Sequence, residues 1–458
     1  MSNASSPEPA KPASLTRRVA KAGSWSIVQV LGINLLRLCS NLIMTRLLVP
    51  EAFGLMAMVS MLIAGFQLFT DIGINRSVSR EPDGDQDHFL RVAWMVKIGR
   101  GSMIASGVLT AAILLWFLAP AYAPAGTVYA DPDLPFLIAL SALVPLMMGF
   151  DSTTRELAQR RLQMQYPAVL EICSQIITIA AMVTFASFNP TVWALMAGML
   201  VGAALKVVST HCFFPGPRMA FVWDREIADR LWRYGKWLMG SSIFTFFAVN
   251  AEKMLLGVFL DSTTFGIFII AVLWVDAGLG VIVRLADGVG FPVISEVMRT
   301  RPEDAPRLYR KLQTGIDAIC LMAFLTLFLG GQLLIDTLYT PVYQIAGAYL
   351  GILALRFLAI RFDTVNGLIM NTGNSRAMML ISGLRAVWVC IALPVAFLYV
   401  NFTAALLVVA LVPMFTVPYS LWLVRPYLGT KQVSFDVLWY VLTLIVAGFV
   451  YANAPPLA

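Results

Sequence analysis

Four cationic side chains lie deep within long apolar segments of this 458-residue chain: Arg37, Lys253, Arg356 and Arg385. A charge at the centre of a bilayer costs from about 2.5 to more than 10 kcal/mol, so such residues normally face a partner or water instead of lipid. Only two carboxylates, Glu252 and Asp276, lie equally deep. Four cations against two carboxylates leave a net charge of +2, which favours binding of an anionic group.

Helical phase places polar neighbours beside two of these cations. Asn34 and Asn41 lie within about 60° of Arg37 on a helix, and Asn250 lies within about 60° of Lys253. A guanidinium can hold a phosphate through two parallel hydrogen bonds, while an ammonium acts as a compact point charge. We therefore predict a water-filled cavity lined by Arg37, Asn41, Asn250, Lys253, Arg356 and Arg385.

A structural role is the alternative for each of these charges. Arg356 has Asp363 on the same helical face seven residues later, so the two could form a local ion pair. Arg37 could likewise neutralise Glu252 or Asp276. If these two carboxylates instead face the cavity, they are candidates for coupling transport to an ion.

The composition identifies the class of protein that must position these residues. Hydrophobic residues make up 59% of the chain, charged residues 13%, and the mean hydropathy is +0.77. Soluble domains have about 45–50% apolar and about 25% charged residues. The five cysteines are scattered and the two histidines lie far apart, so we expect no disulfide framework, metal site or cofactor.

The expected fold is an all-α polytopic membrane protein with 12–13 transmembrane helices, in two pseudo-symmetric six-helix lobes around a central cavity. The apolar runs lie near 24–44, 54–75, 93–119, 134–154, 168–187, 191–210, 236–260, 265–284, 312–335, 344–366, 377–397, 402–424 and 436–453. They divide the chain into a cytoplasmic tail (1–23), an N-terminal lobe (24–210), a cytoplasmic linker with an interfacial helix (211–235), a C-terminal lobe (236–424) and a C-terminal segment with the thirteenth span (425–458).

The distribution of positive charge predicts the orientation. Of the 33 Lys and Arg residues, 28 lie in the N-terminal tail, in the even-numbered linkers or at the helix ends that flank them. This assigns Lys97, Arg100, Lys206, Arg284 and Arg361 to helix ends at the membrane interface. Because cytoplasmic loops carry the excess of Lys and Arg, the N-terminus should lie in the cytoplasm.

An internal repeat appears when the chain is shifted by 212 residues. Gly23 then aligns with Gly235, Trp25 with Trp237, and Phe53-Gly54 with Phe265-Gly266. These identities occur at matching points of the two six-helix sets. Repeats of this kind are typical of secondary transporters, whose substrate site lies between the two halves.

The stretch "SNLIMTRLLVPEAFGLMAMV" followed by "LFTDIGINRSVSRE" resembles the opening of the polysaccharide transporter family. "FPVISEV" and "GLIMNTGNSR" resemble inner linkers of the same family. That family includes the O-antigen and exopolysaccharide flippases of the multidrug/oligosaccharidyl-lipid/polysaccharide superfamily, many of which have fourteen spans. The resemblance extends over nearly the whole chain through the twelfth span.

The resemblance implies a flippase that moves an oligosaccharide linked to polyprenyl pyrophosphate across the bacterial inner membrane by alternating access. Its partners would be this substrate, membrane lipids and the polymerase or export machinery, with no nucleic acid and no second copy of the chain. The main alternative is an ion-coupled antiporter of organic cations, which would need buried carboxylates in excess. A membrane-embedded glycosyltransferase is a third reading, but the linkers are too short for a catalytic module.

The predicted orientation can be tested by labelling with a membrane-impermeant maleimide. Single cysteines at Asp131 and Thr263 should be labelled from outside intact cells, and a cysteine at Glu303 should not. Labelling at Glu303 in intact cells would reverse the orientation.

Overall fold

The computed structural model describes residues 15–285, 297, 304–371 and 375–454. Every regular element in these residues is a helix, and strand pairing is limited to one isolated bridge between Thr127 and Asp261. Eleven helices are long and apolar enough to cross a membrane within the described ranges, or twelve if a bent pair forms one span.

Residues 15–212 form nine α-helices. They are α1 (Leu15–Leu47), α2 (Pro50–Phe69), α3 (Ile74–Arg80), α4 (Asp87–Tyr122), α5 (Asp133–Ser141), α6 (Leu143–Gly149), α7 (Thr154–Arg160), α8 (Gln165–Phe188) and α9 (Val192–Cys212). The bent pair consists of Asp133–Gly149 and Thr154–Arg160, whose axes differ by 56°. Proline favours the first turn of a helix, and Pro50 occupies that position in α2.

The second half begins with α10 (Arg225–Phe259) and α11 (Ser262–Leu285). It continues with α13 (Ala305–Leu338), α14 (Ala346–Leu353), α15 (Leu355–Ile360), α16 (Asp363–Asn371), α17 (Ser375–Tyr399), α18 (Phe402–Ala410) and α19 (Val412–Asn453). Gly429 has a φ of 74° and divides α19 between the last two candidate spans. A left-handed conformation at this bend suits a residue without Cβ.

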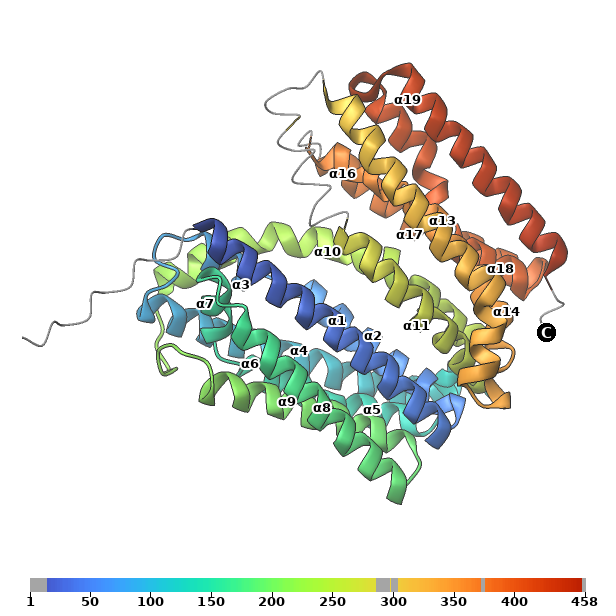
Figure 1. The fold of residues 1–458 in the computed structure, drawn as a ribbon. Coiled ribbons are helices and arrows are strands. Elements are labelled where there is room, and N and C mark those ends of the chain that lie inside the picture. Colours follow the sequence, from blue (N-terminus) through green and yellow to red (C-terminus); the bar gives the residue numbers. More distant parts are fainter. Residues whose placement is uncertain (1–14, 286–296, 298–303, 372–374, 455–458) are drawn as a thin grey trace, which may run out of the picture.

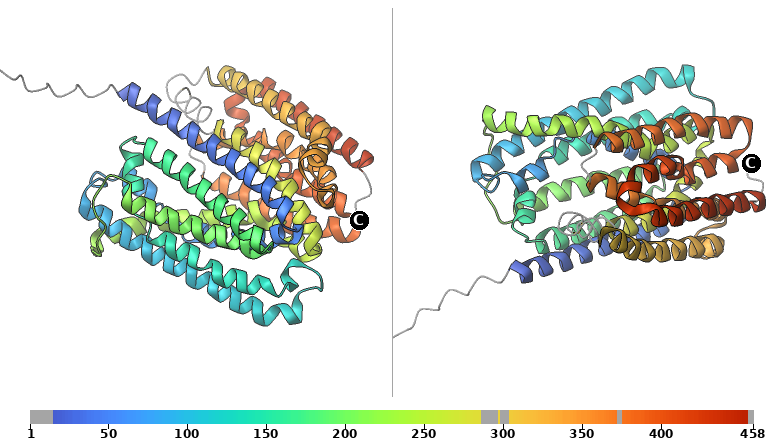
Figure 2. Two further views of the ribbon diagram at one scale, coloured as in Figure 1. Left: turned by 60° about the horizontal axis from the view of Figure 1, so that its bottom comes forward. Right: turned by 90° about the horizontal axis from the view of Figure 1, so that it is seen from above.

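The long helices are arranged in two groups that meet at α2, α10 and α11 (Figures 1 and 2). Large apolar side chains cover the outside of both groups, for example Phe117 at 72% exposure and Leu329 at 73%. An apolar surface this extensive suits contact with lipid, not water. The expected all-α membrane fold is thereby confirmed.

One expected span has an unusual composition. The run 236–260 lies within α10, which is not among the candidate spans found in the described residues, and the polar residues Asn250, Glu252 and Lys253 interrupt its apolar sequence. It nevertheless packs lengthwise against α2 and α17. The other twelve expected runs fall on the eleven candidate spans and the bent pair.

The interfacial helix predicted within residues 211–235 falls on the first turns of α10. The segment is continuous with the rest of α10, and Asp224 caps it by accepting hydrogen bonds from the backbone N–H groups of Glu226 and Ile227. Its apolar residues Ile227 and Leu231 are buried against α3, α4 and α7, so they do not face lipid. Arg230 in the same segment pairs with Asp83 at 2.8 Å.

The two halves approach most closely where α2 and α11 begin. A Cβ placed on Gly266 would lie 2.0 Å from the carbonyl oxygen of Pro50, and one on Gly54 would lie 3.4 Å from that of Ser262. Pro50 and Ser262 are themselves 212 residues apart. Each glycine therefore faces the residue equivalent to the one that the other glycine faces. Contacts of this reciprocal kind are expected for elements related by a two-fold axis.

A hydrogen bond also joins two residues that the repeat makes equivalent. The hydroxyl of Thr263 donates to the carboxylate of Glu51, and these two positions are also 212 residues apart. Ser262 donates its backbone N–H to Gly126, at the same end of the molecule. The linkers that carry Asp131 and Thr263 therefore lie together, as the predicted topology requires, while Glu303 lies outside the described residues.

The C-terminal helices surround a buried charge cluster. Arg361 is only 1% exposed, and its guanidinium bonds Asp317 from α13 at 3.0 Å and Asp436 from α19 at 3.1 Å. The hydroxyl of Tyr309 donates to Asp436, which is fully buried. Arg361 stands at the end of α15, as expected, but it is buried by partners from distant segments that hydropathy does not relate to it.

The contact between the glycines can be tested by adding single methyl groups. Gly266→Ala should lower the melting temperature of the detergent-solubilised protein, because the methyl group overlaps a backbone carbonyl and overpacking costs about 1–3 kcal/mol. Gly383→Ala is the matched control, since no atom lies within 4 Å of its added Cβ. Equal stability of Gly266→Ala and the wild type would contradict the close approach.

The charge cluster can be tested by removing its arginine. Arg361→Ala leaves two buried carboxylates without their cation, and removal of one partner of a buried pair costs about 3–5 kcal/mol. We expect most of the protein to be lost from the membrane in an immunoblot. Restoration of the level by Arg361→Ala combined with Asp317→Asn and Asp436→Asn would identify unpaired charge as the cause, and normal levels of Arg361→Ala alone would contradict it.

Candidate functional site: a cationic pocket between the halves

A central pocket of about 500 Å³ lies between α1, α2, α10 and α11. This volume falls within the range of about 300–1,000 Å³ typical of ligand sites. Its polar and charged lining residues are Asn34, Arg37, Ser60, Asn250, Lys253, Asp276 and Arg284. Of the predicted cavity residues, the structure therefore brings Arg37, Asn250 and Lys253 together.

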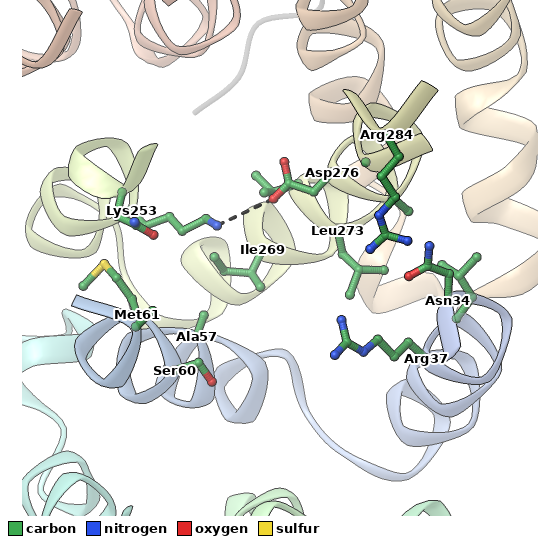
Figure 3. Close-up of a pocket in the computed structure, with 16 residues that line it drawn as sticks. Asn34, Arg37, Ala57, Ser60, Met61, Lys253, Ile269, Leu273, Asp276 and Arg284 are labelled. Carbon is green, nitrogen blue, oxygen red and sulfur yellow. Dashed lines mark ion pairs between the residues drawn. The ribbon is translucent and has the colours of Figure 1, made fainter. Parts of the chain in front are cut away.

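Two arginines enter the pocket on its α1 side. Arg37 and Arg284 point toward the same space from α1 and α11, close to Asn34 (Figure 3). Both side chains are exposed, and neither has an ion-pair partner among the described residues. Two unpaired guanidinium groups that share one space form a site for a multiply charged anion.

Arg284 was missed as a site residue because it stands at the end of an apolar run. The helical spacing of α11 contains a signal that could have identified it. Asp276, Gly280 and Arg284 recur at four-residue intervals and share one face of the helix. Arg284 lies in the last turn of α11, at a helix end as expected, and it also lines the pocket.

The opposite side of the pocket holds a chain of alternating charges. Lys253 Nζ lies 3.7 Å from Asp276 Oδ2, and Arg356 Nη1 lies 3.5 Å from Asp276 Oδ1. Behind them, Arg356 Nη2 binds both carboxylate oxygens of Glu252, at 3.0 and 3.1 Å. Glu252 is 5% exposed and Asp276 is 48% exposed, so only Asp276 is open to the pocket.

These contacts decide between the alternatives for Arg356 and Arg37. Arg356 pairs with Glu252 and Asp276, so its expected local pair with Asp363 was wrong. Asp363 instead accepts a hydrogen bond from Arg385 at 2.8 Å. The expected neutralisation of Glu252 or Asp276 by Arg37 was also wrong, because the cations beside these carboxylates are Arg356 and Lys253.

Two predicted cavity residues lie away from the central pocket. Asn41 accepts a hydrogen bond from the hydroxyl of Tyr339 at 3.1 Å, and that hydroxyl accepts one from the indole of Trp274 at 2.8 Å. Arg385 lies among the C-terminal helices, where it also donates to Thr416 at 3.0 Å. Both side chains join helices and are absent from the pocket lining.

The pocket has an excess of positive charge. Three cations, Arg37, Lys253 and Arg284, line it against one carboxylate, Asp276, which gives a formal charge of +2. Adding the buried pair of Arg356 and Glu252 leaves this sum unchanged. The arrangement can bind a phosphate-bearing group by charge and hydrogen bonding, and a cationic ligand would meet repulsion.

The sequence also matches known proteins. A family model described as "Polysaccharide biosynthesis protein" matches residues 43–346. The succinoglycan biosynthesis transport protein ExoT of Rhizobium meliloti is 22% identical over 74% of this chain and 66% of its own length. The lipopolysaccharide biosynthesis protein WzxC of Escherichia coli is 22% identical over 55% of this chain and 49% of its own length.

Solved structures of low sequence identity share the fold. The lipid II flippase MurJ in an inward closed conformation aligns over 93% of this chain and 97% of its own, with a TM-score of 0.67 at 14% identity. An inward-facing multidrug transporter of the MATE family aligns over 94% and 99%, with a TM-score of 0.62 at 12% identity. The resemblance read from the sequence is confirmed: the chain belongs to the polysaccharide biosynthesis protein family.

Proposed function

We propose that this protein is a flippase for an oligosaccharide linked to polyprenyl pyrophosphate, acting by alternating access in the bacterial inner membrane. The observation that carries the proposal is the central pocket, with three cations against one carboxylate. Two guanidinium groups without ion-pair partners in the described residues, Arg37 and Arg284, match the several acceptor oxygens of a pyrophosphate.

The proposed cycle needs no covalent chemistry from the protein. The pocket would hold the pyrophosphate while the lipid tail stays in the bilayer, and rocking of the two halves would expose the pocket to each side in turn. The hydrogen bonds that join residues 15–212 to residues beyond 240 in the described chain lie at the end formed by residues 41–51, 126–129, 254–263 and 339–343. At the other end the first half bonds the start of α10, through Asp83 with Arg230 and His88 with Asp224. With the N-terminus in the cytoplasm, the end at residues 41–51 would be the outer one.

Energy for transport would come from an ion gradient or from consumption of the product outside, because the sequence contains no ATP-binding loop motif. Of the two candidate coupling carboxylates, Asp276 is better placed than Glu252. It is half-exposed to the pocket and touches both Lys253 and Arg356. Glu252 is buried and held by Arg356, which suits a structural ion pair.

The alternative function, antiport of organic cations, is opposed by the same charges. A cationic drug entering the pocket would approach Arg37, Lys253 and Arg284 and find one carboxylate already paired. A deletion strain separates the two functions: we expect loss of polysaccharide export with unchanged sensitivity to organic cations. Increased drug sensitivity with normal polysaccharide export would overturn the flippase proposal.

Substitution of Arg37 tests the head-group site. Arg37→Ala should reduce export at least about tenfold, because a charge-assisted hydrogen bond contributes about 1.5–3 kcal/mol. Protein abundance should stay nearly constant, since no buried carboxylate in the described residues pairs with this arginine. Arg37→Lys should restore export only in part, because lysine keeps the charge but lacks the planar fork.

Arg46→Ala is the matched control for this experiment. Arg46 lies at the end of the same helix and does not line the central pocket. It should export normally, and export and immunoblot are measured side by side for all variants. Normal export by a stable Arg37→Ala protein would remove Arg37 from the proposed site.

A further inference from the structure

A second cavity lies inside the first lobe and adjoins the central pocket at Arg37. It has a volume of about 420 Å³ and is bounded by α1, α6, α7, α8 and α9. Arg37 lines both cavities, so the two are neighbours on either side of this residue. We call this second cavity the N-lobe pocket.

The wall formed by α8 is a polar stripe within a membrane span. Glu171, Ser174, Gln175 and Thr178 occur at i, i+3, i+4 and i+7, so they share one helical face. The same spacing is present in the sequence, but it was not predicted as a site because this apolar run contains no deep cation. Facing α9 contributes Gly202 and Ala203, whose small side chains leave room beside the stripe.

Several polar groups in this pocket have free hydrogen-bonding capacity. In the described part of the chain, the side chains of Ser174, Gln175 and Gln67 make no hydrogen bond with protein atoms. Thr178 donates its hydroxyl proton to the carbonyl of Ser174 at 2.8 Å, which leaves its oxygen free to accept. Polar groups at this depth in a membrane require water or a ligand as partners.

Three of the four charged residues that line the pocket form ion pairs with one another. Glu171 binds Arg155 and accepts a hydrogen bond from Gln29, with Lys206 at 3.9 Å. Lining cations are Arg37, Arg155 and Lys206 against one carboxylate, again a formal charge of +2. The N-lobe pocket therefore combines charged groups with neutral hydrogen-bond donors and acceptors.

We propose that the N-lobe pocket is the subsite for the sugar chain of the substrate, while the central pocket holds its pyrophosphate. This inference rests on the proposed function and assigns a second part of the ligand to a second cavity. Amides and hydroxyls both donate and accept, as sugar hydroxyls do, and the excess positive charge favours a glycan with an acidic substituent. An acyl chain would leave all of these polar groups without partners.

The test measures dissociation constants of the purified full-length protein for two lipids by native mass spectrometry. One is polyprenyl pyrophosphate without sugar, and the other is polyprenyl pyrophosphate bearing the repeat unit of the host's own exopolysaccharide. The wild type should bind the glycosylated lipid more tightly. Ser174→Ala combined with Gln175→Ala should weaken binding of the glycosylated lipid about tenfold and leave binding of the bare lipid unchanged.

A matched double variant controls for loss of polar groups from a span. Ser106→Ala with Thr110→Val changes two exposed positions of α4 outside both pockets and should leave both dissociation constants unchanged. Arg37→Ala, at the junction of the pockets, should weaken binding of both lipids.

The outcomes separate the two proposals. Wild-type protein that binds neither lipid refutes the flippase proposal itself. Equal wild-type affinity for both lipids, or an unchanged affinity of the Ser174/Gln175 variant for the glycosylated lipid, overturns the sugar subsite alone. An equal loss for both lipids in that variant also overturns the subsite, because the stripe would then serve the head group or the fold.

Discussion

The close approach of α2 and α11 is the constraint on which the arrangement of the two halves depends. Gly266 lies against the backbone of Pro50 with no space for a side chain, and Gly54 faces Gly266 across the same contact. The two helices that meet there continue as two walls of the central pocket, from Ala57 on α2 and from Ile269 on α11. The packing of two glycines therefore sets the separation between walls that carry the ligand-facing charges.

The charged residues divide into two classes according to their partners. Arg361 and Arg356 are held by carboxylates from other helices, and such pairs contribute mainly by fixing which helices meet, since desolvation offsets much of their attraction. Arg37 and Arg284 have no such compensation in the described residues. The free-energy cost of placing these two charges within a membrane is low only while the pocket contains water or an anion. The empty and occupied states of the pocket therefore differ in electrostatic energy.

Hydropathy and helical phase predicted the helical class, nearly all spans, and the shared location of Arg37, Asn250 and Lys253, because these properties depend on residues close in sequence. These patterns failed where contacts between distant segments determine the partner of a charged residue. Arg361 looks like a residue at a helix end, but Asp317 and Asp436 bury it from two other helices. Arg356 has a plausible partner one heptad away, yet α10 and α11 supply closer ones. Neither relation is encoded in the local pattern.

The hydrogen bond between Glu51 and Thr263 has a consequence for the origin of the chain. In a homodimer of identical halves, a residue on the two-fold axis faces its own copy, so a glutamate there would meet a glutamate and the two like charges would repel. A duplicated and fused gene is free of that restriction, because each copy can mutate alone. The repeat aligns Lys253, which lines the pocket, with Asn41, which instead bonds Tyr339 between helices. Equivalent positions of the two halves thus perform different tasks, one facing the pocket and one joining helices.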